Sequence, residues 1–144
     1  MTTKKPLVLY SGEIEEIRSG DNVTTDANSY TAVADGTLLE YKAVYASGAG
    51  SVSYADFAAA TTGPAIGISG SEITDTNEGA IIISGVLTMS GLVTGSSYYV
   101  GELGSLITSG DLPSGTGSYV QKVGIALSTT QLKVDFEDFT VLNA

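Results

Sequence analysis

The chain of 144 residues contains no cysteine, no histidine and no tryptophan. Without cysteine it can form no disulfide, no thiolate nucleophile and no Cys-ligated zinc or iron–sulfur centre. Without histidine it lacks the commonest general acid–base catalyst and the commonest metal ligand. These absences favour a protein that is not an enzyme and that holds neither a metal nor a cofactor.

Charged residues are also scarce, and most of them are acidic. They make up 15% of the chain, with 16 acidic against 6 basic residues and a net charge of −10. Nucleic acids and anionic lipid surfaces are bound through clustered Lys and Arg, so six scattered cations argue against both kinds of partner. The acidity suits solubility or a basic partner surface, and composition alone leaves both interpretations open.

Long hydrophobic runs are missing as well. No apolar run approaches the roughly 18–20 residues that a membrane-spanning helix needs. The apolar stretch near the N-terminus is too short for the core of a signal peptide. We therefore expect synthesis and residence in the cytoplasm, with later passive release left open.

Short runs rich in β-branched and aromatic residues fill the chain, and Gly, Ser and Thr separate them. This cadence is typical of an antiparallel all-β domain. The runs occupy residues 65–69, 80–89, 97–100, 119–127 and 131–136. From residue 79 on, none has the length and 3.6-residue period of a surface helix, and residues 54–60 are the one short helix expected. The sequence predicts a compact antiparallel β-sandwich or β-barrel-like domain with an extended N-terminal arm and at most one short helix.

Several local patterns refine this expectation. Asp35-Gly36 is a hairpin turn signal, and residues 38–46 after it alternate as a half-buried strand does. Gly67 and Gly124 interrupt β runs, which indicates a bulge or a close backbone approach.

Two further patterns concern the later strands. The run Ile81-Ile82-Ile83 is apolar on both faces, which places it at the centre of the sheet, covered on both sides. Tyr98 and Tyr99 must point to opposite faces of one strand, so one of the two rings is expected to be partly exposed.

The N-terminal arm is expected over residues 1–12, ahead of a single all-β domain over residues 13–144. Pro6 requires an extended start, and an apolar run follows it. This run is either the first strand of the domain's own sheet or an arm that adds to the sheet edge of a neighbouring subunit. On the second interpretation the partner-binding residues are Pro6, Leu7, Val8, Leu9 and Tyr10.

Two acidic patterns could carry chemistry, and both have simpler explanations. The stretch 75–79 is similar to the first half of a calcium loop, but its Gly comes one place early and Val86 stands where the bidentate Glu belongs. An ordinary turn is the preferred interpretation. Two carboxylate clusters could pair as in a glycosidase, although acidic clusters beside turns are usually solvated surface. These clusters are Glu13, Glu15 and Glu16, and Asp135, Glu137 and Asp138.

Two stretches resemble structural proteins of tailed bacteriophages. Residues 5–21, beginning Lys5-Pro6-Leu7-Val8-Leu9-Tyr10-Ser11-Gly12-Glu13-Ile14, resemble the opening of small virion proteins, where a Pro-apolar arm precedes a Gly-x-Ile-Glu phrase. Residues 91–136, with Gly91-Leu92, Tyr98-Tyr99 and Val120-Gln121-Lys122-Val123-Gly124, resemble a β module of capsid decoration proteins, head fibres and tail fibres. The motif marks packing and turns, so it transfers no catalytic or binding residue.

The resemblance implies a capsid decoration (cement) protein, because the long repetitive shafts of fibres are missing. It implies a location on the capsid surface of the virion after synthesis in the host cytoplasm. The major capsid protein would be the partner, and the chain itself would be a homo-oligomer, with a trimer favoured. The alternative is a receptor- or glycan-binding fibre component that uses Tyr side chains and the loops 47–51 and 104–117. A hydrolase built on carboxylates alone is the weakest hypothesis.

Overall fold

The computed structural model describes residues 27–142. The arm expected over residues 1–12, with its proposed partner-binding segment Pro6–Tyr10, lies outside the described residues. The same is true of the first carboxylate cluster, Glu13, Glu15 and Glu16.

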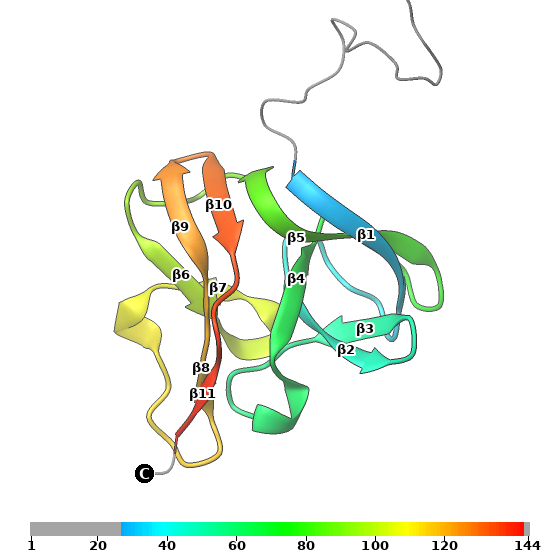
Figure 1. The fold of residues 1–144 in the computed structure, drawn as a ribbon, viewed down its shortest axis with the longest axis horizontal. Helices are drawn as coiled ribbons and strands as arrows, with labels where there is room; N and C mark the ends of the chain where they lie inside the picture. Colours follow the sequence, from blue (N-terminus) through cyan, green and yellow to red (C-terminus); the bar gives the residue numbers. More distant parts are fainter. Residues whose placement is uncertain (1–26, 143–144) are drawn as a thin grey trace, which may run out of the picture.

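The described residues form an almost purely β structure, which confirms the expected fold class (Figure 1). The strands are β1 (Ala27–Ala34), β2 (Ala43–Gly48), β3 (Ser51–Tyr54), β4 (Ala65–Ser69), β5 (Glu78–Thr88), β6 (Ser97–Val100), β7 (Leu106–Ile107), β8 (Tyr119–Val120), β9 (Lys122–Ser128), β10 (Gln131–Asp135) and β11 (Thr140–Val141). Three short 3-10 helices connect them, η1 (Ala60–Thr62), η2 (Glu102–Gly104) and η3 (Ser109–Asp111). In this part of the chain, no helix has the length and apolar character needed to cross a bilayer.

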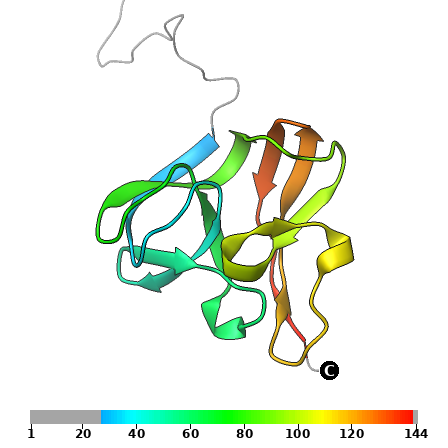
Figure 2. The ribbon, with the colours of Figure 1, turned by 180° about the vertical axis from the view of Figure 1, so that it is seen from behind.

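Nine strands form one continuous sheet whose first part closes on itself. The order is β1-β3-β2-β4-β5-β10-β9-β6-β7, and an additional pairing of β1 with β5 closes the first five strands into a barrel. Closure removes the free edges of these five strands. The other four strands extend the sheet beside the barrel, and β8 pairs with β11 below them in the view of Figure 1 (also seen from behind in Figure 2).

The wall of strands β2, β4 and β5 separates two hydrophobic cores and contributes side chains to both of them. The barrel core lies inside the closed strands and consists of Ala32, Ala34, Leu38, Val44, Val52, Ile73 and Ile81. The sheet core lies on the other face of the wall and includes Ala43, Ile68, Leu87, Tyr98, Val100, Val123, Ala126, Leu132 and Val134. Adjacent residues such as Ala43 and Val44 therefore enter different cores, as strand geometry requires.

A bulge in β5 changes which side chains face the sheet core. Asn28 pairs with Ser84 and Ser29 with Ile82, so Ile83 has no partner in β1. Ile81 is fully buried in the barrel core, and Ile82 packs against the sheet core. Ile83 is 39% exposed, so the expected two-sided covering holds for only two of the three isoleucines. The extra residue shifts the alternation, which then turns Leu87 into the sheet core.

Three local expectations were wrong. The strand expected over 38–46 is broken: Leu38 forms an isolated bridge with Ile73, a turn follows, and β2 starts only at Ala43. Asp35-Gly36 is a turn but joins no hairpin, because β1 pairs with β3 and β5. Residues 54–60 contain no α-helix, and the 3-10 turn η1 begins only at Ala60. At these three segments, pairing with distant strands determines the secondary structure and overrides the local preference.

The two strand glycines are sites of close approach, as their position predicted. A Cβ at Gly124 would collide with the backbone carbonyl oxygen of Lys133 on β10, and one at Gly67 would collide with the side chain of Ile81. The Tyr pair also behaves as expected, since Tyr98 is buried and Tyr99 is half-buried.

We predict that Ile81→Ala destabilises the fold far more than Ile83→Ala does. Ile81 is fully buried in the barrel core, whereas Ile83 on the same strand is 39% exposed. Emptying the buried site should lower the free energy of unfolding by about 3 kcal/mol, and the exposed site by less than about 1 kcal/mol. Urea unfolding of the two variants measures the difference, and equal losses would contradict the two-core description.

Candidate functional site

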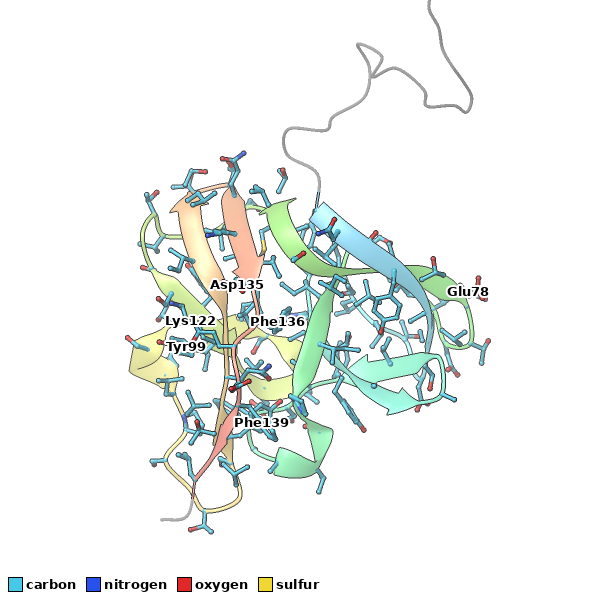
Figure 3. The ribbon with its side chains drawn as sticks, viewed as in Figure 1. Glu78, Tyr99, Lys122, Asp135, Phe136 and Phe139 are labelled. Atoms are coloured by element: carbon cyan, nitrogen blue, oxygen red, sulfur yellow. The ribbon has the colours of Figure 1, made fainter. Side chains whose placement is uncertain are left out.

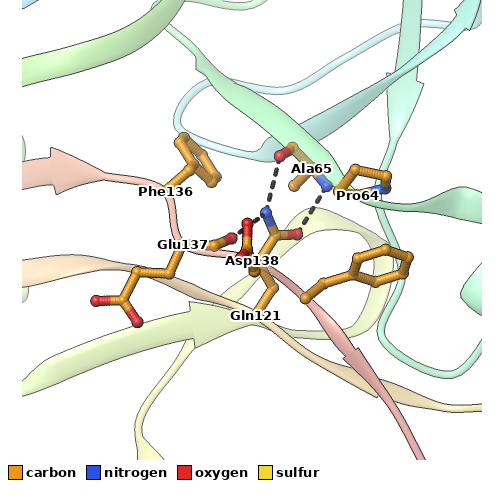
Figure 4. Close-up of a pocket in the computed structure, with 7 residues that line it drawn as sticks. Pro64, Ala65, Gln121, Phe136, Glu137 and Asp138 are labelled. Atoms are coloured by element: carbon orange, nitrogen blue, oxygen red, sulfur yellow. Dashed lines mark hydrogen bonds between the residues drawn. The ribbon is translucent and has the colours of Figure 1, made fainter.

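The side chain of Gln121 bridges two segments of the sheet that do not pair with each other. Gln121 stands between β8 and β9 and is 2% exposed. Its Oε1 accepts a hydrogen bond from the Ala65 N–H at 2.7 Å, and its Nε2 donates to the carbonyl oxygens of Ala65 at 3.0 Å and Glu137 at 3.1 Å (Figure 4). The buried amide is thereby satisfied by backbone groups on both sides.

The gap that Gln121 spans follows from the pairing of β5. On the edge opposite β1, β4 pairs with β5 at Ile82 and β10 pairs with it at Ser84. Because neighbouring positions of one edge cannot carry two strands side by side, β4 and β10 separate there. β10 ends at Asp135, and the next four residues lie outside any strand until β11 begins at Thr140. We refer to the space between Pro64–Ala65 and Phe136–Phe139 as the Gln121 groove.

The Gln121 groove combines apolar walls with carboxylates. Its volume is about 570 Å³, and it is lined by Pro64, Ala65, Gln121, Phe136, Glu137, Asp138 and Phe139. Phe136 and Phe139 are half-buried, because each also packs against the sheet core. In Figure 3 Phe136 lies close to Lys122 and Asp135, and Phe139 lies further along the chain towards β11. Apolar walls with a few fixed polar groups are typical of binding clefts.

Contacts with β9 fix the position of Glu137. Its backbone N–H donates to the Lys122 carbonyl oxygen at 3.1 Å, and its Oε2 lies 3.9 Å from the Lys122 Nζ. The ion pair is solvent-exposed on the Glu137 side, so it contributes at most about 1 kcal/mol. Its effect is mainly positional, because it holds the Glu137 carboxylate towards Lys122 and away from Gln121 and Ala65, while Asp138 stays exposed (Figure 4).

A buried tyrosine supports the Phe139 side of the groove. The Tyr119 ring meets the Phe139 ring edge-to-face, with centroids 5.1 Å apart, a favoured aromatic geometry. Tyr119 is fully buried, and its hydroxyl donates to the Thr62 carbonyl oxygen at 3.4 Å. Burial raises the pKa of Tyr119 to about 12, with the Thr62 side chain acting the other way and the Asp56 carboxylate adding to the rise.

The structure brings one predicted acidic cluster to this place. Glu137 and Asp138 both line the groove, and Asp135 ends the strand that leads into it. Glu137 is paired with Lys122, and Asp138 beside it is exposed.

The suspected calcium loop is an ordinary turn in the structure. Asp75 accepts a hydrogen bond from the Gly36 N–H at 2.9 Å, which ties the turn to the β1 end of the barrel. Among residues 27–142, no group of three or more Asp and Glu side chains could hold a metal ion.

A second, smaller hollow of about 310 Å³ lies between the β2 side of the barrel and the loop before β6. Its lining includes Glu40, Tyr41, Lys42, Tyr98 and Ser105. Tyr41 has a φ of 62°, an unusual backbone conformation for a bulky residue. Burial and the neighbouring Glu40 carboxylate both raise the pKa of Tyr41. Of the two loops expected to bind a receptor, only 104–117 reaches this hollow, through Ser105 and Leu106.

Three residues define the groove without a sequence motif that predicts their role: Gln121, Phe136 and Phe139. The run 119–127 reads as one strand, whereas the pairing breaks at Gln121 between β8 and β9. A signal was present, because Gln121 shares its alternation phase with the apolar Tyr119 and Val123. A glutamine at such an inward position needs buried hydrogen-bond partners, and these mark a place where two strands separate.

Scans against protein-family models and against curated proteins found no match to this chain.

We predict that Gln121→Leu lowers the free energy of unfolding by about 3 kcal/mol. The change removes three hydrogen bonds and leaves buried backbone groups of Ala65 and Glu137 without partners. Urea unfolding measures the loss, and Gln131→Leu on the half-buried position of β10 is the control, with an expected loss below about 1 kcal/mol. A loss no larger than that of the control would show that the bridge is unimportant.

We predict that Tyr119 makes the fold sensitive to alkaline pH. The pKa of about 12 in the folded state exceeds the ordinary tyrosine value near 10. The contribution to stability is therefore complete below about pH 10 and is lost as the pH rises towards 12. Urea unfolding across this range should show a steeper decline for the native chain than for Tyr119→Phe. Parallel declines would mean that the buried hydroxyl titrates normally.

Proposed function

We propose that the chain is a non-enzymatic virion structural protein that binds the outer surface of an assembled phage capsid. The partner is the major capsid protein, and the bound copies form a homo-oligomer, with a trimer favoured. A protein that binds the assembled lattice more tightly than its free subunits stabilises the lattice by mass action. No cofactor takes part in this function.

The Gln121 groove is the observation that carries the proposal. It offers two half-buried phenylalanines, the exposed carboxylate of Asp138, and a stretch of chain between two strands. Such surfaces accept extended polypeptides, which add backbone hydrogen bonds at a strand and place alternate side chains in pockets. The groove thus supports binding of polypeptide, and the resemblance in residues 91–136 supports a virion as the setting.

The outer face of β9 adds to the available contact surface. Ile125 is 38% exposed and Leu127 is 48% exposed, both on the face away from the sheet core. Lys133 lies opposite Ile125 in the sheet register. This arrangement supports a contact that is apolar at its centre and charged at its edge, as protein interfaces are.

The hollow at Tyr41 supports the second candidate, a receptor- or glycan-binding fibre component. Tyr41 keeps a φ of 62° beside Glu40 and Lys42. Strained backbone persists where the surrounding structure holds it and is frequent at binding sites. The ring with its charged neighbours suits a polar ligand such as a sugar.

The location of the chain on intact particles separates the two functions. We expect gold-labelled antibody raised against the purified chain to mark the heads of the encoding phage at many lattice positions. We also expect heads stripped of the chain to lose heat resistance and to recover it when the native protein is added back. Labelling confined to the tail or to single vertices would support the fibre component, and purified particles without the chain would overturn both functions.

A further inference from the structure

The Gln121 groove has the form of a site that lacks one strand. β4 and the run 136–139 face each other across it, and the Gln121 amide joins them by bonding to backbone groups on both sides. Glu137 directs its N–H to Lys122 and its carbonyl oxygen to Gln121. In extended chain the backbone groups of successive residues point to opposite edges, so those of Phe136 and Asp138 suit an added extended segment.

The charges of the groove select a basic occupant. Three of the six basic residues and five of the 16 acidic residues precede residue 27, so residues 27–142 carry three lysines against eleven carboxylates. Glu137 and Asp138 both line the groove, and Glu137 is matched by Lys122 while Asp138 stays exposed. An apolar segment led by cations would complement both the rings and the excess negative charge.

One segment of the chain has this chemistry. Lys4-Lys5 is the only pair of adjacent cations in the sequence, and Pro6-Leu7-Val8-Leu9-Tyr10 follows it directly. Sixteen residues, 11–26, connect Tyr10 to the start of β1. Such a connection spans at most about 55 Å when fully extended, which is more than the width of a domain of this size.

We propose that the segment Lys4–Tyr10 of the same chain occupies the Gln121 groove. The lysines lie towards Asp138, and the apolar residues cover Phe136 and Phe139. A tether raises the local concentration of the segment to the millimolar range, so the groove of its own chain fills before that of a second copy in dilute solution. The inference does not depend on the capsid, although an arm that grips a capsid would first have to leave this groove.

Engineered cysteines test this contact directly, because the native chain has none. Val8→Cys combined with Asp138→Cys should form a disulfide under mild oxidation of the full chain at low micromolar concentration. The matched control combines Val8→Cys with Glu78→Cys. Glu78 is also an exposed carboxylate within reach of the tether, but it lies at the barrel end, away from Phe139 (Figure 3). We expect the first pair to close at least about tenfold faster, which corresponds to an effective concentration advantage set by docking.

The gel mobility of the oxidised product identifies the occupant. A monomeric, faster-migrating product in the Val8/Asp138 pair is expected. Equal rates for the two pairs would overturn the inference. A predominantly dimeric product would also overturn it, because it would show that the segment in the groove comes from a second copy and not from the same chain. Neither result would bear on labelling of the capsid, so failure of this inference and failure of the proposed function are distinguishable.

The same reaction reports the role of charge. For this test the second cysteine stands at Thr140, an exposed residue next to Phe139, so that Asp138 stays in place. Adding Lys4→Glu and Lys5→Glu to this Val8→Cys/Thr140→Cys pair should slow closure by about threefold to tenfold, in line with two surface ion pairs. The control changes Arg18→Glu and Lys42→Glu, which alters the net charge equally but leaves the segment intact. If both double changes slow closure to the same extent, net charge alone is responsible and the placement of the lysines towards Asp138 is wrong.

Discussion

Burial of β5 between two cores is the constraint on which the rest of the molecule depends. Ile81 faces the barrel core and Ile82 faces the sheet core, so one strand has to fill two interiors from its alternate faces. The stabilising free energy of apolar burial is roughly proportional to the apolar area removed from water. A strand with apolar side chains in both cores therefore contributes to stability from both of its faces. The bulge at Ile83 shifts the alternation of side chains by one residue, so that Leu87 points into the sheet core after β5 has left the barrel.

The groove is a consequence of the same strand. One edge of β5 pairs with β4 at Ile82 and with β10 at Ser84, so β4 and β10 have to separate. Without a bridging group, backbone N–H and C=O groups near this separation would have no hydrogen-bond partner. A buried unpaired polar group costs about 1–3 kcal/mol. Gln121 offsets this cost, because its side-chain amide forms the hydrogen bonds to Ala65 and Glu137 that a neighbouring strand would otherwise form. The concave surface left outside it is therefore a consequence of the strand topology.

The sequence was sufficient for the class of fold and insufficient for the pairing. Short β-branched runs predicted β4, β5, β6 and β10 because these strands carry their pattern locally. Residues 38–46 looked like one strand, yet Leu38 pairs with Ile73 and β2 begins only at Ala43. Which residues pair depends on which distant strand lies beside them, and the local sequence carries no information about that. Closure of the barrel by β1 and β5 likewise joins segments about fifty residues apart.

The candidate site was harder to predict than the fold, because its residues are of common types and acquire a role only through their positions in the fold. Glu137 and Asp138 were recognised as an acidic cluster, but only the fold shows that Phe136 and Phe139 frame them and that Lys122 engages one of them. Exposed ion pairs contribute little affinity on their own, and at physiological ionic strength screening limits their reach to about 8 Å. Binding energy at this groove must therefore come from the two rings and the open backbone. In the proposed occupancy the Asp138 carboxylate sets the direction in which the extended segment lies, because charge complementarity governs orientation more than affinity.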